Sequence, residues 1–251
     1  MDCRLEICCA DIESVLAAKE GGADRIELCS ALEIGGLTPS WGLISEAIDI
    51  FGGRNVNVLI RPRPGDFVYS DPEFKVMEND IAESVSLGAG GIVVGALSAS
   101  GEIEMEVLGK IRSRFPDVTF TFHRAFDLIS DPFKALDDVI SLGFNRILTS
   151  GLAPDAFAGS PLIKRLVEKS EGKIDIMAGS GVSQDNIIHI IRQTLVRDVH
   201  ASAKIVVESK NKNTRKGVSM GTSDGDDYMR LITSAEKVAI LKELCNTAYE
   251  N

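Results

Sequence analysis

The chain has 251 residues, a hydrophobic share of 44% and a formal net charge of −10. This length and apolar content allow one large α/β domain or two small ones, and they argue against intrinsic disorder. The acidic balance and the lack of a basic stripe interleaved with aromatic residues argue against nucleic acid as a partner. No apolar run approaches the roughly 18 residues of a membrane helix, so we expect no membrane partner.

The five cysteines are an odd number and show no CxxC spacing. Such a pattern is unlike a disulfide scaffold, and the N-terminus, MDCRLEICCADIES, lacks the basic and apolar segments of a signal peptide. We therefore expect a reducing, cytoplasmic location.

Apolar strand patterns alternate with helical patterns along the chain. Helical segments end at glycines such as Gly88 and Gly143, and Asp131-Pro132 is typical of a helix start. The expected strands are 5–9, 25–29, 56–61, 91–97, 118–123, 146–150, 174–179 and 198–203. The expected helices are 11–20, 40–50, 73–87, 104–114, 132–142, 161–170, 184–194 and 234–247.

Eight alternating strand and helix units over this length predict a TIM (β/α)8 barrel, with residues 1–251 as a single domain. The main alternative is a doubly wound open sheet. That fold usually has a glycine-rich first turn, and the first turn here, CCADIES, contains no glycine.

One segment interrupts the alternation, the stretch 204–228 between the eighth strand and the last helix. We expect a long loop there, which is typical of a functional lid or of poor order. Its lysines and arginine fit a solvated loop, and a clamp on a ligand is the alternative interpretation.

Alternate residues of a barrel strand point inward and outward, and the outward set should be the more apolar one. Applied to each strand, this rule leaves an unusually polar interior. The inward ionisable residues are Glu6, Glu27, Arg61, His123, Asp175 and His200.

Charges inside a dry core are costly unless they are paired, so this group indicates a site at the C-terminal end of the barrel. Glu6, Glu27, Arg61, His123 and His200 are the candidate catalytic residues. A structural ion pair of Glu6 or Glu27 with Arg61 is the alternative.

The turn after the seventh strand, MAGSGVSQDN, places Gly179, Ser180 and Gly181 before a helix. Small residues at such a turn let backbone N–H groups face an anion, although a tight turn alone explains the glycines as well. Three further residues complete the expected anion-binding set, namely Arg63, Arg124 and Ser202.

Cys8 and Cys29 belong to the similar stretches RLEICC and RIELCS, and both are expected to face the interior from adjacent strands. A free cysteine often acts as a small hydrophobic residue. Two thiolates, however, suit a soft cation such as Cu(I), so this pair is the candidate metal site.

Seven stretches resemble the CutC family, named for copper homeostasis. They are LEIC, EGGADRIELCSALEIGGLTPSWGLI, IRPRPGDFVYSDPEF, TFHRAFDLISDP, RILTSG, IMAGSGV and VHASAK. The resemblance implies a TIM barrel, a cytosolic location, often a homodimer, and copper handling with Cu(I) at Cys8 and Cys29. The turn IMAGSG, which looks like IMPGGG in relatives, and the lysine-rich tail depart from the family pattern.

Two functions follow from these observations. The first is a cytosolic copper homeostasis protein that binds Cu(I). The second is an enzyme that uses acid/base chemistry on a small anionic or phosphorylated metabolite, with Arg61 on the anion. A copper carrier has little need of Arg61, Arg63, Asp66, His123, Arg124 and His200. In that reading His123 or a glutamate carries the proton.

Overall fold

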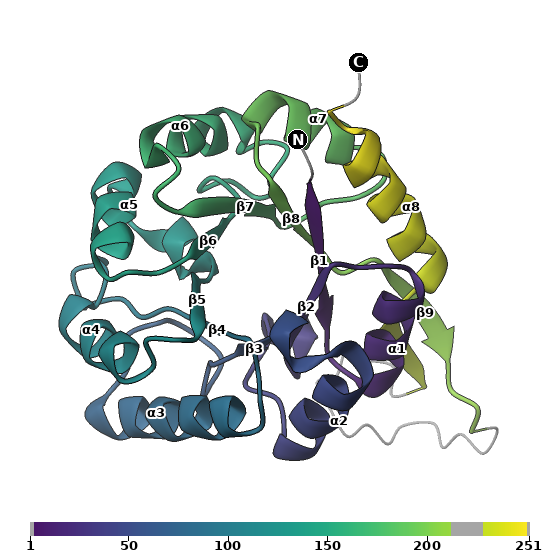
Figure 1. The fold of residues 1–251 in the computed structure, drawn as a ribbon, viewed down its shortest axis with the longest axis horizontal. Helices are drawn as coiled ribbons and strands as arrows, with labels where there is room; N and C mark the ends of the chain where they lie inside the picture. Colours follow the sequence, from purple (N-terminus) through teal and green to yellow (C-terminus); the bar gives the residue numbers. More distant parts are fainter. Residues whose placement is uncertain (1–2, 212–227, 250–251) are drawn as a thin grey trace.

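In the computed structural model, which describes residues 3–211 and 228–249, eight parallel strands close into a barrel. Each strand pairs with the next one along the chain, and the eighth returns to the first, with Glu6 opposite His200. Figure 1 looks down the barrel and shows the helices as a layer around the ring of strands. The predicted TIM (β/α)8 fold is confirmed.

The barrel strands are β1 (Arg4–Cys9), β2 (Arg25–Leu28), β3 (Val56–Leu59), β4 (Gly91–Val94), β5 (Thr119–Phe122), β6 (Arg146–Thr149), β7 (Asp175–Gly179) and β8 (Asp198–Ala201). The helices are α1 (Ile12–Glu20), α2 (Trp41–Phe51), α3 (Asp71–Ser86), α4 (Met105–Arg114), α5 (Pro132–Ser141), α6 (Ser160–Ser170), α7 (Ile187–Thr194) and α8 (Ala235–Thr247). Short 3-10 turns η1 (Leu32–Ile34), η2 (Gly53–Asn55) and η3 (Arg124–Leu128) lie between them.

Local sequence explains where the helices begin and end, as α5 illustrates. The Asp131 side chain accepts hydrogen bonds from the backbone N–H groups of Phe133 and Lys134, and Pro132 occupies the first turn. After the helix, Gly143 adopts a φ of +73°, a left-handed conformation that favours glycine.

The alternation of inward and outward residues also holds. Outward residues such as Ile7 and Leu28 are fully buried in the core between the barrel and the helices. Inside the barrel, Cys8, Cys29, Leu59 and Val93 form a separate small apolar cluster. The rest of the described interior is largely polar, and this leaves room for a site.

The expectation of a loop over 204–228 is wrong at its start. Residues 204–208 form β9 (Lys204–Glu208), which pairs in antiparallel fashion with β10 (Met229–Thr233). Figure 1 shows β9 outside the ring of helices, near α1. The three consecutive β-branched residues Ile205, Val206 and Val207 favour the strand, because such side chains suit an extended, half-exposed ribbon. The part of the predicted loop at 212–227 lies outside the described residues.

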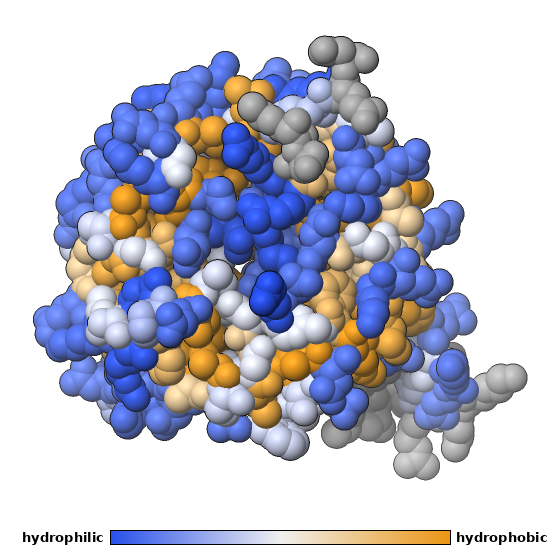
Figure 2. Space-filling model, in the orientation of Figure 1, coloured by the Kyte–Doolittle hydropathy of each residue, from blue (hydrophilic) through white to orange (hydrophobic). Residues whose placement is uncertain are grey.

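Hydrophobic and hydrophilic residues are mixed on the surface. The face in Figure 2 carries hydrophilic residues over its centre and along much of its rim, with hydrophobic residues between them. Within residues 3–211 and 228–249, no helix has the length and apolar character needed to cross a bilayer.

Candidate metal centre and ligand cavity

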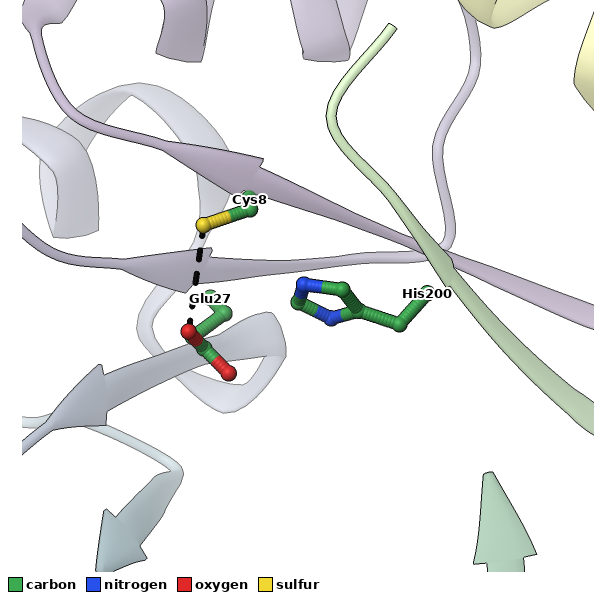
Figure 3. Close-up of side chains that lie close together, drawn as sticks. All are labelled: Cys8, Glu27 and His200. Carbon is green, nitrogen blue, oxygen red and sulfur yellow. Dashed lines mark hydrogen bonds between the residues drawn. The ribbon is translucent and has the colours of Figure 1, made fainter. Parts of the chain in front are cut away.

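Three neighbouring strands bring a thiol, a carboxylate and an imidazole to one corner of the barrel. Cys8 on β1 is level with Glu27 on β2, and His200 comes from β8 on the other side of β1. One ligand atom from each residue lies within 4.8 Å of the other two. Figure 3 shows the three side chains pointing toward one another. We call this group the β1 corner.

A glycine makes room for the imidazole at this corner. A Cβ atom on Gly179 would lie 2.5 Å from Cδ1 of Leu148 and 3.2 Å from Cβ of His200. The first contact is with the end of a flexible side chain, which would have to move, and the second is tighter than most contacts of a Cβ atom, so glycine limits crowding beside His200. Gly179, which the sequence indicated as part of an anion site, therefore has a packing role.

The His200 ring is held by a carboxylate beneath it. Nδ1 of His200 lies 3.0 Å from Oε1 of Glu6, and an ionised carboxylate can only accept, so Nδ1 donates. The second oxygen of Glu6 accepts from Nε of Arg25 at 3.1 Å and from Nδ2 of Asn57 at 2.7 Å. This network leaves Nε2 of His200 as the nitrogen for a metal ion, as in carboxylate–histidine–metal arrangements.

Burial and neighbouring charges shift the pKa values of Glu6, His200 and Glu27. Burial raises the pKa of Glu6, but the hydrogen bond from His200 and the charge of Arg25 outweigh it and hold the pKa below its usual range. Burial lowers the pKa of His200, but the charge of Glu27 and the bond to Glu6 raise it well above its usual value. Burial raises the pKa of Glu27 to about 7, and the His200 charge offsets this only in part.

A second thiol stands next to the β1 corner. The sulfurs of Cys8 and Cys29 lie 3.6 Å apart, and the Cys8 sulfur lies 3.8 Å from Oε1 of Glu27. The two cysteines, which the sequence analysis placed on the inward faces of adjacent strands, thus bring their sulfurs close together. The hydrogen bond with Cys29 and burial raise the pKa of the Cys8 thiol well above its usual value. The thiol is therefore protonated before metal binding, which would release that proton.

The β1 corner opens into a cavity of about 510 Å³ in the mouth of the barrel. This volume lies within the usual range for small-molecule sites. The predicted site residues that line it are Cys8, Glu27, Arg61, His123, Arg124, Ser180, Gly181, His200 and Ser202. Asp127 and Lys204 line it as well.

Other predicted residues lie elsewhere. Glu6 and Cys29 are 0% exposed and do not line the cavity. Arg63 extends outside it, with its guanidinium paired to Asp66 and Glu73. Asp175 was expected at the mouth, and this expectation is wrong. It is the first residue of β7, is half-exposed, and pairs with Arg4 at the opposite end of the barrel.

Arg61 is a buried cation that follows β3 and lines the same cavity. Its guanidinium donates to the backbone oxygens of Ile34, Gly36 and Gly65. It is 6% exposed, its Nε–H has no partner, and no carboxylate of the described residues lies within 4.0 Å of it. The alternative interpretation, a structural ion pair of Arg61 with Glu6 or Glu27, is therefore wrong, because Glu6 pairs with Arg25 instead.

His123 is a neutral donor. Its Nδ1 accepts a hydrogen bond from the backbone N–H of Ala125 at 3.1 Å, so the neutral ring carries its proton on Nε2. Burial and the charge of Arg61 lower the pKa of His123 to about 3. The ring therefore stays uncharged near pH 7, which disfavours it as a proton carrier.

The turn after β7 is less open to an anion than its glycines indicate. The hydroxyl of Ser180 donates to the backbone oxygen of Pro154, and a Cβ on Gly181 would lie 2.8 Å from Cβ of Asp155. α7 begins only at Ile187, because the side chain of Asn186 bonds the turn and delays the helix. The acidic neighbour and the late helix start both weaken the reasons for an anion site here.

The sequence reasoning missed the charged layer below the β1 corner. Arg25 pairs with both Glu6 and Asp198, and Arg146 pairs with Asp198 and donates to Thr121. These residues obey the same inward alternation as the mouth residues. Applying that rule to the first residue of each strand would have found them.

The fold and the site together define a TIM-barrel protein with sulfur, imidazole and carboxylate donors at one side of its cavity. The CutC family model matches residues 3–205, and the chain belongs to this family. The matched region ends within β9, in agreement with the divergent tail.

Individual relatives agree with this assignment. A CutC family protein of Bacteroides thetaiotaomicron is 44% identical over 236 residues, or 94% of this chain and 95% of that protein. A crystal structure of a Streptococcus agalactiae protein, named CutC and assigned to copper homeostasis, is 35% identical and has a TM-score of 0.75. It covers 80% of this chain and 98% of its own. Thiamine phosphate pyrophosphorylase of Pyrococcus furiosus shares 12% identity and a TM-score of 0.59 over 98% of this chain and 96% of its own, which shows the fold alone.

Proposed function

We propose that this protein binds Cu(I) at the β1 corner, through Cys8, Glu27 and Nε2 of His200, with Cys29 as a second thiol. The convergence of three ligand atoms within 4.8 Å carries the proposal. Thiolates are soft ligands that suit Cu(I), and imidazole suits copper as well. The name of the family, from copper homeostasis, points in the same direction.

The surroundings of the β1 corner fit a metal ion. Oε2 of Glu27 is buried and has no partner, so it is free to bind a cation. Metal–thiolate bonds are about 2.3 Å long for zinc, and bonds of similar length would let one ion reach both Cys8 and Cys29 across 3.6 Å. Glu6 would orient His200 from behind, and such partners support affinity in known metal sites.

Anaerobic Cu(I) titration against a competing chelator tests the proposal. Wild type should bind one equivalent, and Cys8→Ala should bind at least about tenfold more weakly. Cys9→Ala is the matched control, because Cys9 is on the same strand but faces the helices. Equal binding by the Cys8 and Cys9 variants would contradict the proposal. Elemental analysis of the purified protein would reveal zinc as the alternative cargo.

A second candidate function is an enzyme that acts on a small anionic metabolite. The observation in its favour is Glu27, which lines the cavity and has its pKa raised to about 7, the range suited to proton transfer. Arg61, Arg124 and Ser202 would bind the anion from the same cavity. Mass spectrometry of the protein as purified would test this function, since a bound organic anion supports it and copper alone does not.

A cytosolic location and a homodimer complete the proposal. All five cysteines carry free thiols, which fits a reducing compartment. The hairpin of β9 and β10 exposes Val206, Met229 and Leu231, apolar residues that a second copy could cover. Sedimentation analysis would test the dimer.

A further inference from the structure

The cavity joins two features that a simple copper carrier would not need together. The first is the β1 corner and the second is the buried cation Arg61, which follows β3, and both line the same cavity. A buried charge without a counter-charge is costly. Arg61 has no acidic partner within the described residues, and its Nε–H is unpartnered, so the cavity offers a place for an anion to compensate it.

A second cation adds to the uncompensated positive charge of the cavity. Lys204, at the start of β9, lines the cavity and has no acidic partner among the described residues. The other cations of the lining differ, because Arg124 pairs with Asp127, and His200 has Glu6 and Glu27. The positive charge that lacks a counter-charge therefore belongs to Arg61 and Lys204.

The β1 corner would also leave its ion incompletely enclosed. Three protein ligands with an open position toward a cavity are typical of metal sites that accept an additional ligand. Cys29, the fourth possible protein ligand, does not line the cavity, so it would leave the cavity-facing side of the ion open. An additional ligand would therefore come from the cavity itself.

We propose that copper occupies this cavity as a complex with a small anionic ligand, whose donor atom binds the ion and whose charged end contacts Arg61 and Lys204. This inference rests on the proposed Cu(I) function. The ligand class is a small thiol or carboxylic acid that carries a second, negatively charged group. Its thiolate or carboxylate stays bonded to the ion, while the Cys8 thiol and Nε2 of the His200 imidazolium each lose a proton to solvent.

Two carriers of similar size provide the test, mercaptoacetate, which has a carboxylate, and 2-mercaptoethanol, which is neutral. The Cu(I) affinity of the whole protein is measured anaerobically with each carrier at fixed ionic strength, against a competing chelator. The two carriers differ in their own affinity for Cu(I). The informative quantity is therefore the ratio of the protein's two measured Cu(I) affinities, one with each carrier, and how that ratio changes between variants. We expect Arg61→Met to lower the preference for mercaptoacetate about tenfold, and Lys204→Met to lower it less.

Arg63→Met is the matched control, since Arg63 is two residues away but outside the cavity. Its preference should equal that of wild type. Native mass spectrometry of the wild type supplies a readout that depends on no variant, and it should show protein, copper and mercaptoacetate in one complex. If Arg61→Met does not fold, Lys204→Met and this mass measurement decide.

The outcomes distinguish a failure of this inference from a failure of the proposed Cu(I) binding. Unchanged carrier preference in Arg61→Met and Lys204→Met, or a copper complex without mercaptoacetate, would overturn the inference while copper binding stands. Failure of folded wild type to take copper from either carrier would overturn both.

Discussion

Nδ1 of His200 lies 3.0 Å from Oε1 of Glu6, although the two residues are 194 positions apart in the chain. The bond exists because β8 returns to pair with β1, with these two residues directly opposite in the register. It orients the imidazole so that Nε2 is left for the ion proposed at Cys8 and Glu27. Glu6 is thus a positioning residue that acts through His200.

Replacing Glu6 by Gln should weaken Cu(I) binding about 10- to 100-fold, as for other carboxylates behind a metal-binding histidine. The amide keeps the shape but removes the charge that orients the imidazole. Competition titration measures the effect, and circular dichroism checks the fold. Glu168→Gln, an exposed glutamate on α6, is the control. An unchanged affinity in folded Glu6→Gln would remove Glu6 from this role.

Gly179→Ala should impair both stability and copper binding. The added methyl group would lie 2.5 Å from Leu148 and 3.2 Å from His200, and overpacking of this kind typically costs about 1–3 kcal/mol. Urea denaturation and Cu(I) titration measure the two effects. Gly42→Ala on α2 has nothing within 4 Å of the new methyl group and should be close to neutral. A stable Gly179→Ala protein with full affinity would contradict this packing role.

The stability of the protein should depend on pH through Glu27. Its pKa in the folded state is raised to about 7 from 4.5, so the folded state holds this proton more tightly than the unfolded state. The corresponding stability is present below pH 4.5 and is lost as the pH rises to about 7. Glu27→Gln has no such proton to lose.

Relative to wild type, Glu27→Gln should therefore gain on the order of 1–3 kcal/mol between pH 4.5 and pH 8. Urea denaturation at both pH values, without metal, gives the difference. Glu168→Gln should show no comparable gain. A constant difference between wild type and Glu27→Gln across this range would show that Glu27 titrates normally.

Arg25→Met should destabilise the protein by about 3–5 kcal/mol, because it removes the buried cation that the carboxylates of Glu6 and Asp198 share. Arg63→Met, which removes a surface guanidinium, should cost much less. Chemical denaturation of both variants measures the two losses in the free energy of unfolding. Equal losses would mean that the buried network contributes no more than a surface pair.

Much of the fold was accessible from the sequence because its signals are local. Glycine and Asp-Pro boundaries mark where helices stop and start, and α5 begins and ends where those residues predicted. The alternation of apolar and polar residues also assigned Ile7 and Leu28 to the helix-facing side, as observed. The hairpin of β9 and β10 escaped prediction because its two strands are 20 residues apart and gain their order only from pairing.

The sequence by itself determined which face of each strand Glu6, Cys8, Glu27 and His200 occupy, because side chains alternate with a strict period of two. It did not determine their heights within the barrel, because height depends on how neighbouring strands are staggered. The tertiary register sets Cys8 level with Glu27, and Glu6 level with Arg25 and His200. Because of that stagger, the Cys8 thiol lies beside the Glu27 carboxylate and the His200 imidazole as well as beside the expected second thiol. The same stagger leaves Arg61 without an acidic partner among the described residues.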